Sequence, residues 1–531
     1  VKLLGITPAV AYNLILPTVL MLTGIGVFSI VWNIAENERG EAGGSQRSLA
    51  AGGAGLLAMI LLGNLGVIRM FLQGIQRLAS GGINPVEGGF FQRLLWTAVG
   101  LLQFFRTGTL GYRLDEWYWN PSRVIGAEHG GPITEFPFFT FLYGDLHAHF
   151  LALPLTVLAL AWVVSLVLSR KNELLKEGWL HYLALPVFGA LVVGALRPTN
   201  TWDYYPYLAL GIAAIGFSWI GKQDHRKPVS WLKAGVQIAL FVFLTSLLYQ
   251  PYLNWYGAGY TSVKNWYGTK TPLNDYFTHW GLFLIVILSW MAAETIQWMA
   301  STPASALKKL KPVRELILGL LLLMLVIMLS QGTTIESGFE LGGVRWIGAG
   351  VHVIWFVLPV MVWAGIMLLR PGLSAAKQVV IVLIGTGLAI TLMVELVYVE
   401  GDIGRMNTVF KFYLQTWTLF AVSGGAGFGW LLSSINKWPK KLSMVWKAVF
   451  FALLFGAALY PVLGGVAKIK DRMAPEAPST LDGMLFMKYA DYNDLNTELD
   501  LEEDYHAIQW MQENVQGSPV IVEANQVEYH W

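Results

Sequence analysis

The sequence predicts an all-α polytopic membrane protein with about 12 transmembrane helices, followed by the start of an extracytoplasmic α/β domain. Two observations lead to this fold class. Hydrophobic residues make up 55% of the 531 residues and charged residues only 13%, about half of the roughly 25% typical of soluble domains. Mostly apolar runs also recur along the chain, and most approach the ~20 residues that span about 30 Å of hydrocarbon.

Each apolar run is interpreted as one transmembrane helix because its length and composition suit a membrane crossing. The run at 94–105 is too short to cross, so we expect it to form an interfacial or re-entrant helix within a long outer loop, 69–147. Residues 1–465 are therefore predicted to form a transmembrane helical domain. The twelve predicted spans are 7–32, 49–68, 148–168, 180–196, 204–220, 234–249, 277–298, 315–330, 346–369, 378–398, 409–432 and 448–463.

The Lys and Arg residues of the short connections predict the orientation. One alternating set of connections holds 19 Lys or Arg in 78 residues, and the other set holds 5 in 59. Cytoplasmic loops carry the excess of positive charge, so the first set is predicted to be cytoplasmic. The 69–147 loop and the C-terminal segment are then predicted to be extracytoplasmic.

Residues 466–531 differ in composition from the rest of the chain. They are polar and acidic, and "DYHAIQWMQENV" (504–515) has the pattern of an amphipathic helix. A turn at 517–519 and a buried strand at 520–524 are expected to follow. This pattern predicts the first unit of an α/β domain, and we expect the sequence to be a piece of a longer protein, because it starts without Met and stops directly after the predicted strand.

The composition excludes several classes of function. The absence of cysteine excludes disulfides, thiolate catalysis and iron–sulfur clusters. A net charge of +2 provides no global field that would gather nucleic acid. The sequence contains no phosphate-binding glycine loop, zincin motif or G-x-S-x-G elbow, so nucleotide hydrolysis and serine hydrolysis have no support.

The first polar cluster precedes the predicted span at 148–168. Asp145, His147 and His149 lie within five residues, and Glu135 lies ten residues before Asp145. A carboxylate and two imidazoles at this spacing can converge on a divalent ion where the backbone is extended. Alternatively, Asp145 caps the N-terminus of the following helix. Both interpretations remain open from the sequence.

The second polar cluster is the connection "RPTNTWD" at 197–203, which presents Arg197, Asn200 and Asp203 beside a tryptophan. A guanidinium binds phosphate through two parallel hydrogen bonds, so one interpretation is that Arg197 contacts an anionic ligand. The other is that Arg197 only pairs with Asp203.

The third polar cluster surrounds the start of the predicted span at 409–432. Asn407, Lys411 and Gln415 are spaced as one stripe of a helix, and Asp402 and Arg405 precede them. A cation inside a membrane span is by default a functional hypothesis; the alternative is that the lysine stem extends to the interface. Glu395 is a candidate counter-ion for the lysine. Because few cations occur in the short outer loops, the three clusters together predict one anion-binding pocket at the outer face.

Four motifs, at 2–30, 134–155 ("TEFPFFTFLYGDLHAHFLALPL"), 196–207 ("LRPTNTWDYYPY") and 402–417 ("DIGRMNTVFKFYLQTW"), resemble an uncharacterised family of polytopic membrane proteins of the YYY type from archaea and green non-sulfur bacteria. That family is similar in outline to the C-type glycosyltransferases, which use polyprenyl-phosphate-linked sugars at the outer face. Members generally carry an earlier helix and an acidic first outer loop that are not found in this sequence.

The resemblance implies roles for the clustered residues. Asp145 or Glu135 would be the catalytic carboxylate, and Arg197, Arg405 and Lys411 would face the lipid-linked phosphate. Mn²⁺ or Mg²⁺, if used, would be held by Asp145 with the two nearby histidines, and imidazole favours Mn²⁺. The predicted substrate-binding set is Arg197, Asn200, Asp203, Asp402, Arg405, Asn407, Lys411 and Gln415.

The expected function is transfer of a sugar from a polyprenyl-phosphate donor at the outer face of the cell membrane, with membrane lipid and the lipid-linked sugar as partners. A carboxylate would take the proton of the acceptor hydroxyl, and cations would stabilise the departing polyprenyl phosphate. Two alternatives remain open from the sequence. One is a transporter or flippase of an anionic or lipid-linked solute, and the other is a non-catalytic membrane protein of envelope assembly.

Overall fold

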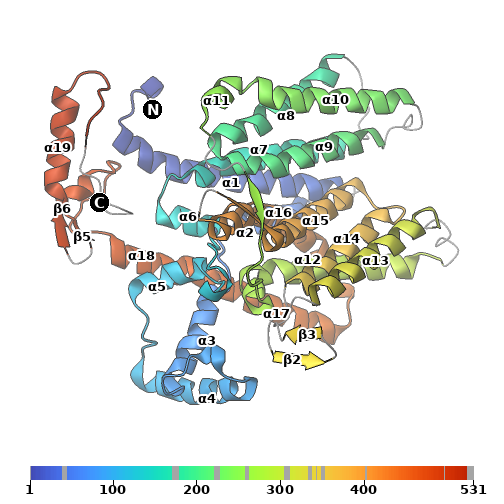
Figure 1. The fold of residues 1–531 in the computed structure, drawn as a ribbon, viewed down its shortest axis with the longest axis horizontal. Helices are drawn as coiled ribbons and strands as arrows, with labels where there is room; N and C mark the ends of the chain where they lie inside the picture. The colour runs from blue at the N-terminus through green and yellow to red at the C-terminus, as the bar shows by residue number, and fades with distance from the viewer. Residues whose placement is uncertain are drawn as a thin grey trace.

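The computed structural model describes residues 2–38, 45–169, 179–220, 228–257, 262–303, 311–332, 338–341, 344–347, 353–400, 403–494 and 497–522. Within these residues the chain is mostly helical (Figure 1). The all-α prediction is thus confirmed at the level of secondary structure, and the strands form only short two-stranded pairs.

Six helices in the described part of the chain are long and apolar enough to cross a membrane. Shorter apolar helices are α8 (Trp179–Thr199), α10 (Pro228–Leu247) and α14 (Ile354–Leu369). These helices fit a multi-pass membrane protein, but the predicted number of twelve spans is not confirmed. The six long helices are α1 (Pro8–Asn37), α7 (Ala148–Leu168), α12 (Leu273–Ser301), α15 (Ala375–Leu396), α16 (Arg405–Ser434) and α17 (Lys440–Leu459), which continues through a π-helical turn (Tyr460–Gly464) into α18 (Gly465–Arg472).

Some of the remaining predicted spans form helices, but these are short or begin late. Helix α9 (Tyr204–Ile220) matches a predicted run, yet its 17 residues rise only about 26 Å, less than the ~30 Å of hydrocarbon. Helix α13 (Lys311–Gly332) covers the run at 315–330. Of the run at 346–369, Ile354–Leu369 forms α14, its first two residues belong to a strand (Val344–Ile347), and 348–352 lie outside the described residues.

The predicted span at 49–68 is wrong, because two helices replace it. Helix α2 (Ser45–Ile60) ends and α3 (Gly66–Ala79) begins on either side of a break at 61–65. Buried Asn64 stabilises this break: its Oδ1 accepts the Gly66 N–H at 2.8 Å, and its Nδ2 donates to the Pro121 carbonyl at 2.7 Å. The side chain thereby satisfies backbone groups that a helix end leaves without partners.

Helix α16 is the centre of the bundle and packs against α1, α2, α12 and α15. Small residues allow the close approach of α2, since a Cβ added at Gly425 would lie 2.8 Å from the Cα of Gly55. Helices α7 to α10 lie together on one side of this centre, and α12 to α14 lie on another (Figure 1). The predicted span at 409–432 is therefore the core of the fold.

The predicted interfacial run at 94–105 forms α4 (Phe90–Thr107), which packs against α3 and projects from the bundle (Figure 1). The contact is close, because a Cβ at Gly100 would lie 1.9 Å from the carbonyl oxygen of Ile75. Phe90 and Phe105 near the two ends of α4 are 74% and 81% exposed. Phe is among the residues on the apolar face of helices that lie in the membrane interface, so an interfacial α4 remains the prediction.

Short helices and strands complete the described chain. Strands β1 and β4 pair antiparallel and bring Val263 opposite Val399 at the start of α16. The other pairs, β2 with β3 and β5 with β6, are also antiparallel. The elements are α5 (Leu114–Trp119), α6 (Pro137–Tyr143), α11 (Gln250–Trp255), β1 (Val263–Asn265), β2 (Gly338–Leu341), β3 (Val344–Ile347), β4 (Val397–Val399), β5 (Asp491–Asp494), β6 (Thr497–Asp500) and α19 (Leu501–Asn514).

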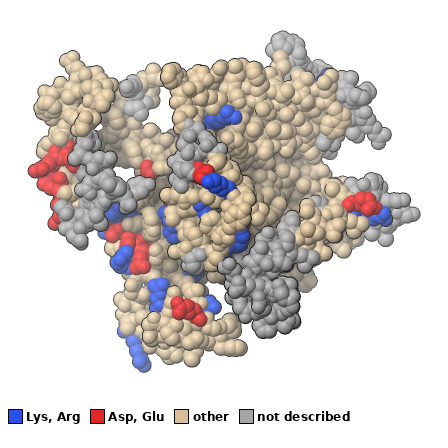
Figure 2. Space-filling model, viewed as in Figure 1, with Lys and Arg blue, Asp and Glu red and all other residues tan. Residues whose placement is uncertain are grey.

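The C-terminal segment forms its own small cluster. Helix α19 agrees with the predicted amphipathic helix, and Leu501 and Tyr505 pack with Met487. Acidic side chains gather over this region, while the face above α7 to α10 is nearly free of charge (Figure 2). The strand predicted at 520–524 is wrong for its described part, because Val520 and Val522 are each 96% exposed and pair with no strand among the described residues. The predicted domain boundary at 465 falls inside the helical stretch that ends with α18.

Candidate functional site

The second and third predicted clusters meet around Asp203, in the 3-10 turn (Thr201–Asp203) that links α8 to α9. Asp203 is 1% exposed, and neither carboxylate oxygen has a hydrogen-bond partner of good geometry among the described residues. Asn200 from the same connection, and Gln415 and Lys411 from α16, lie close enough to act on its charge. The helical stripe predicted on α16 therefore faces the predicted polar connection.

Burial is the main influence on the charge of Asp203. Removing the carboxylate from water raises the pKa of Asp203 to about 8, and Asn200, Gln415 and Lys411 lower it in part. Gln415 is 1% exposed, and its amide makes no hydrogen bond of good geometry among the described residues, although it lies close enough to Asp203 to lower the pKa of that carboxyl. The group is thus a buried carboxyl that is mostly protonated at pH 7, with Asn200, Gln415 and Lys411 close enough to act on its charge.

Arg197 lies at the end of α8 and does not pair with Asp203 among the described ion pairs. Its guanidinium carbon lies 4.0 Å from the ring centroid of Tyr204, in a cation–π contact. The side chain is half-buried. Of the two interpretations open from the sequence, the Arg197–Asp203 ion pair is therefore wrong. Contact of Arg197 with an anionic ligand remains a prediction.

The residues around the start of α7 are only partly brought together. His147 Nδ1 lies 3.2 Å from Asp145 Oδ2, and both side chains are more than half exposed. His149 is 6% exposed, with its ring 4.5 Å from that of Phe410 on α16, and neither ring nitrogen has a hydrogen-bond partner in the described part of the chain. His147 occupies the N-cap position of α7 and makes no side-chain cap, so the alternative that Asp145 caps this helix is wrong.

A three-ligand metal site is not formed by these side chains. Among the described residues, no group of three or more His, Asp or Glu side chains lies close enough to hold a metal ion. Asp145 and His147 offer one oxygen and one nitrogen donor, whereas the His149 ring is turned into an aromatic contact. Binding of Mn²⁺ or Mg²⁺ at this position remains a prediction.

Glu135 lies in a partly enclosed site near α6. Its carboxylate oxygens lie 3.5 Å from Arg123 Nη1 and 3.5 Å from Thr140 Oγ1. Burial raises the pKa of Glu135 to about 7, and Arg123 opposes this shift while Asp145 adds to it. The two predicted catalytic carboxylates are therefore close enough to influence each other. A carboxyl that titrates near neutral pH is suited to general base catalysis.

Arg405 has a structural role that the sequence did not predict. Its Nη2 lies 2.6 Å from Glu395 Oε1 and 3.0 Å from Thr271 Oγ1, and its Nη1 donates to the His129 carbonyl at 2.6 Å. The side chains of Arg405 and Glu395 are 1% and 2% exposed. Protein groups thus enclose the guanidinium, and the structure presents no exposed edge of it to a lipid phosphate. Glu395 is the counter-ion of Arg405, so its predicted pairing with Lys411 is wrong.

The other members of the predicted set are placed as follows. Asn407 and Lys411 are half-buried on α16, and each has partners. Asp402 lies outside the described residues. Lys411 lies within electrostatic range of Asp203, and extension of its stem to the interface remains the alternative.

A large apolar groove lies beside Asp203 and was not predicted from the sequence. Its volume is about 1000 Å³, and it runs between α9, α14, α15 and α16, with Trp202 and Phe412 in its wall. These two rings neighbour Asp203 and Lys411 along the chain, and they lie 6.3 Å apart. The sequence did contain a signal, because small residues recur at helical spacing on two of the lining helices: Ala209 and Ala213, and Gly385 and Ala389.

Comparison with known proteins gives one match. A family model described as "Uncharacterized membrane protein (DUF2298)" matches residues 1–420. No curated protein and no solved structure matches the chain.

Proposed function

The chain belongs to this family of uncharacterised membrane proteins, and from that premise we propose that it transfers a sugar from a polyprenyl-phosphate donor at the extracytoplasmic face of the cell membrane. One observation carries the proposal: an apolar groove of about 1000 Å³ has Trp202 and Phe412 in its wall, and these residues directly adjoin Asp203 and Lys411 along the chain. A polyprenyl-phosphate sugar has the same division into a long apolar chain, an anionic phosphate and a polar sugar.

The donor would lie with its isoprenoid chain in the groove and its phosphate near Arg197 and Lys411. Binding sites usually have apolar walls and a few precisely placed polar groups. Here Trp202 and Phe412 belong to the apolar wall and adjoin the polar residues Asp203 and Lys411 along the chain. Arg197 is held over Tyr204, and the part of the chain that the structure describes contributes no hydrogen bond or ion pair to its guanidinium, which we assign to the phosphate. Arg405 is not assigned to the phosphate, because it is enclosed by Glu395 and its other partners.

The reaction would be a displacement at the anomeric carbon. The acceptor hydroxyl oxygen forms the new bond to that carbon, the bond to the phosphate oxygen breaks, and polyprenyl phosphate leaves with the electron pair. A carboxylate takes the hydroxyl proton, and cations stabilise the negative charge that develops on the phosphate. Asp145 and Glu135 are the predicted bases. Asp203 is added to them as a candidate that must first lose its proton, because its pKa is raised to about 8 and its chain neighbour Trp202 lies in the groove wall.

A bound divalent ion would supply further charge stabilisation. Asp145 and His147 have donor atoms of the right type, but His149 contacts Phe410 instead of completing the set. The residues present therefore do not fit a three-ligand site in this arrangement. No step of the proposed reaction depends on the ion.

The test is binding of a fluorescent polyprenyl-phosphate sugar to the full chain in nanodiscs. We expect wild type to bind and Arg197→Ala to lose roughly tenfold or more in affinity, since a charged hydrogen bond is worth about 1.5–3 kcal/mol. Arg314→Ala is the matched control, because Arg314 is exposed and forms its ion pair among the described residues with its neighbour Glu315. Trp202→Ala should weaken binding of the lipid but not of the free sugar phosphate.

Transfer to water or to an added acceptor then identifies the base. Asp203→Asn, Glu135→Gln and Asp145→Asn are compared at equal donor occupancy. The variant that lowers turnover without lowering donor affinity identifies the base. If neither wild type nor any variant binds the donor, the proposal is overturned. If the donor binds but no sugar is transferred under any acceptor condition, the assignment of the groove as a donor site stands and the proposed reaction is wrong.

Transport of a lipid-linked solute is the second candidate, and one observation favours it. The break between α2 and α3 at Asn64 divides a predicted span, and discontinuous helices form the substrate sites of many transporters. Movement of the fluorescent donor across vesicles containing the full chain, with no glycosylated product, would support transport in place of transfer.

A further inference from the structure

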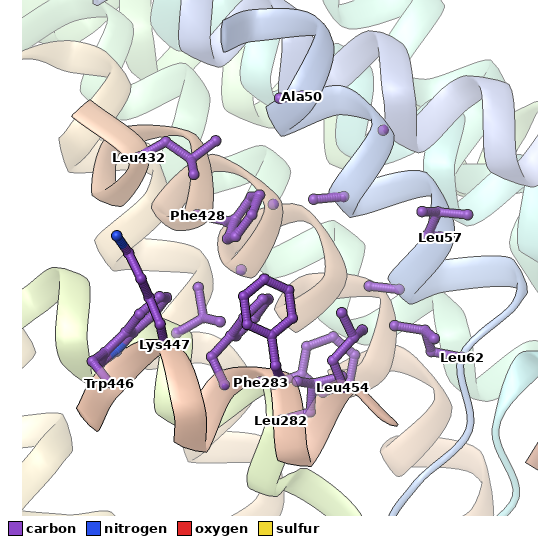
Figure 3. A pocket seen from close by; sticks show the side chains of 18 of the residues that line it. Ala50, Leu57, Leu62, Leu282, Phe283, Phe428, Leu432, Trp446, Lys447 and Leu454 are labelled. Atoms are coloured by element: carbon purple, nitrogen blue, oxygen red, sulfur yellow. The ribbon is translucent and has the colours of Figure 1, made fainter. Parts of the chain in front are cut away.

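A second apolar pocket lies beside α16 (Figure 3), and it is lined by other α16 residues than the groove. Its volume is about 530 Å³. Helix α16 forms the floor with Gly424 and Phe428, α2 and α17 form the walls, and α12 closes part of it with Phe283. Its lining residues are apolar except for Lys447. The pocket is therefore suited to a hydrocarbon chain and not to a polar solute.

Small residues on α2 keep this pocket open. A Cβ added at Gly53 would meet no atom within 4 Å, so no protein side chain fills the space in front of it. The opposite face of α2 differs, because Gly55 is in tight contact with Gly425. The pocket thus lies on the side of α2 that carries Gly53, away from Gly55, and no described side chain fills the space in front of Gly53.

Positive charge gathers at one end of the pocket. Lys447 lies at that end and Leu62 at the other (Figure 3). Arg47 on α2 donates to Ser433 Oγ at 3.2 Å, and these residues are one turn or less beyond the lining residues Ala50 and Leu432. The exposed cations of this region form no ion pair with any described Asp or Glu; they are Arg47, Lys437, Lys440, Lys441 and Lys447.

We propose that this pocket binds one anionic membrane phospholipid, with an acyl chain along the apolar walls and the phosphate near Lys447 and Arg47. Charge complementarity selects this occupant, because basic clusters beside membrane helices attract anionic lipids. A zwitterionic lipid would fill the walls equally but would leave the cations without a net negative partner. The site is separate from the proposed donor groove, with which it shares no lining residue.

The test uses delipidated full-length protein and native mass spectrometry with phosphatidylglycerol and phosphatidylcholine of identical acyl chains. Wild type should retain one phosphatidylglycerol in preference to phosphatidylcholine. Gly53→Leu places a side chain in the open space and should abolish retention of that lipid. Lys447→Gln should lower the preference about fivefold, the ratio that corresponds to about 1 kcal/mol for one lysine near a membrane surface, without changing phosphatidylcholine retention.

Two control variants match these changes elsewhere. Gly235→Leu adds the same side chain on α10, where a Cβ also meets no atom within 4 Å. Lys470→Gln removes an exposed lysine from α18. Both should behave as wild type.

Three outcomes would overturn the inference. They are equal retention of the two lipids by wild type, an unchanged preference in Lys447→Gln, and full retention in Gly53→Leu. A change of oligomeric state in Gly53→Leu would instead assign the pocket to a second copy of the chain. Because Lys447 is exposed, its variant tests the idea even if Gly53→Leu fails to fold. Donor binding at the groove is measured separately, so failure of either proposal is distinguishable from failure of the other.

Discussion

Asp203 should make the stability of the protein depend on pH. In the unfolded chain its pKa has the ordinary value of 3.8, and in the folded chain burial raises its pKa to about 8. A raised folded-state pKa contributes stability that is fully present below pH 3.8 and is lost as the pH rises through 8. Replacing Asp203 by Asn, which carries no charge at any pH, removes this loss.

The magnitude follows from the two pKa values. Between pH 6 and pH 8 the folded state releases its proton while the unfolded state has already done so, and the linkage relation gives a loss of about 2 kcal/mol. Wild type should therefore lose about 2 kcal/mol relative to Asp203→Asn over this interval. The sign of the effect is fixed, because the free energy of unfolding of wild type relative to Asp203→Asn must be greater at the lower pH.

The assay is denaturant-induced unfolding of both proteins in the same detergent at pH 6, 7 and 8, followed by tryptophan fluorescence. Glu135→Gln serves as the matched variant, because the pKa of Glu135 is raised only to about 7 and its difference from wild type should be smaller, about 1.4 kcal/mol. If the difference between wild type and Asp203→Asn is the same at all three pH values, Asp203 is solvated and the reasoning fails. A difference of opposite sign would mean that a cation stabilises the carboxylate.

Two further predictions concern the packing of the bundle. Glu395→Gln should lower the free energy of unfolding by about 3–5 kcal/mol, because it leaves the buried Arg405 guanidinium uncompensated; a change under about 1 kcal/mol in the same unfolding assay would contradict this. Gly100→Ala should cost about 1–3 kcal/mol through overpacking, since its Cβ would lie 1.9 Å from the Ile75 carbonyl oxygen. Faster proteolysis between α3 and α4 is the expected readout, and Gly235→Ala, which meets open space, should show wild-type cleavage.

Long apolar runs were the most reliable signal in the sequence. The runs at 148–168 and 204–220 coincide with α7 and α9, because a continuous apolar segment in hydrocarbon must satisfy its backbone groups as a helix. The run at 49–68 was wrongly predicted as one span, because hydropathy does not show that the side chain of one Asn can hydrogen-bond the backbone groups at a helix break. Asn64 needs Pro121 and Gly66 as partners, and Pro121 is far away in the sequence.

The candidate site was predictable by residue type but not by pairing. Arg197, Asp203 and Lys411 were selected as unusual polar residues, and the structure does place Lys411 and Asp203 within electrostatic range. The partner of each charge depends on the tertiary fold, so Glu395 was assigned to Lys411 when Arg405 is its neighbour in space. The groove was not predicted because it forms between small side chains that lie on separate helices. The spacing of small residues along one helix does not show which other helix faces them.

The Arg405 ion pair also constrains the order in which the bundle can be assembled. Glu395 and Thr271 bind the guanidinium side by side, and His129 adds its carbonyl, yet all three are synthesised before Arg405. Until then, Glu395 has only Thr271 as a described side-chain partner, and α1, α2, α12 and α15 lack the helix that lies between them. The contacts of α16 with α1, α2, α12 and α15 can therefore form only after those helices have been synthesised. Pairs that contact each other directly, such as α1 with α2 and α7 with α8, do not depend on α16 in this way.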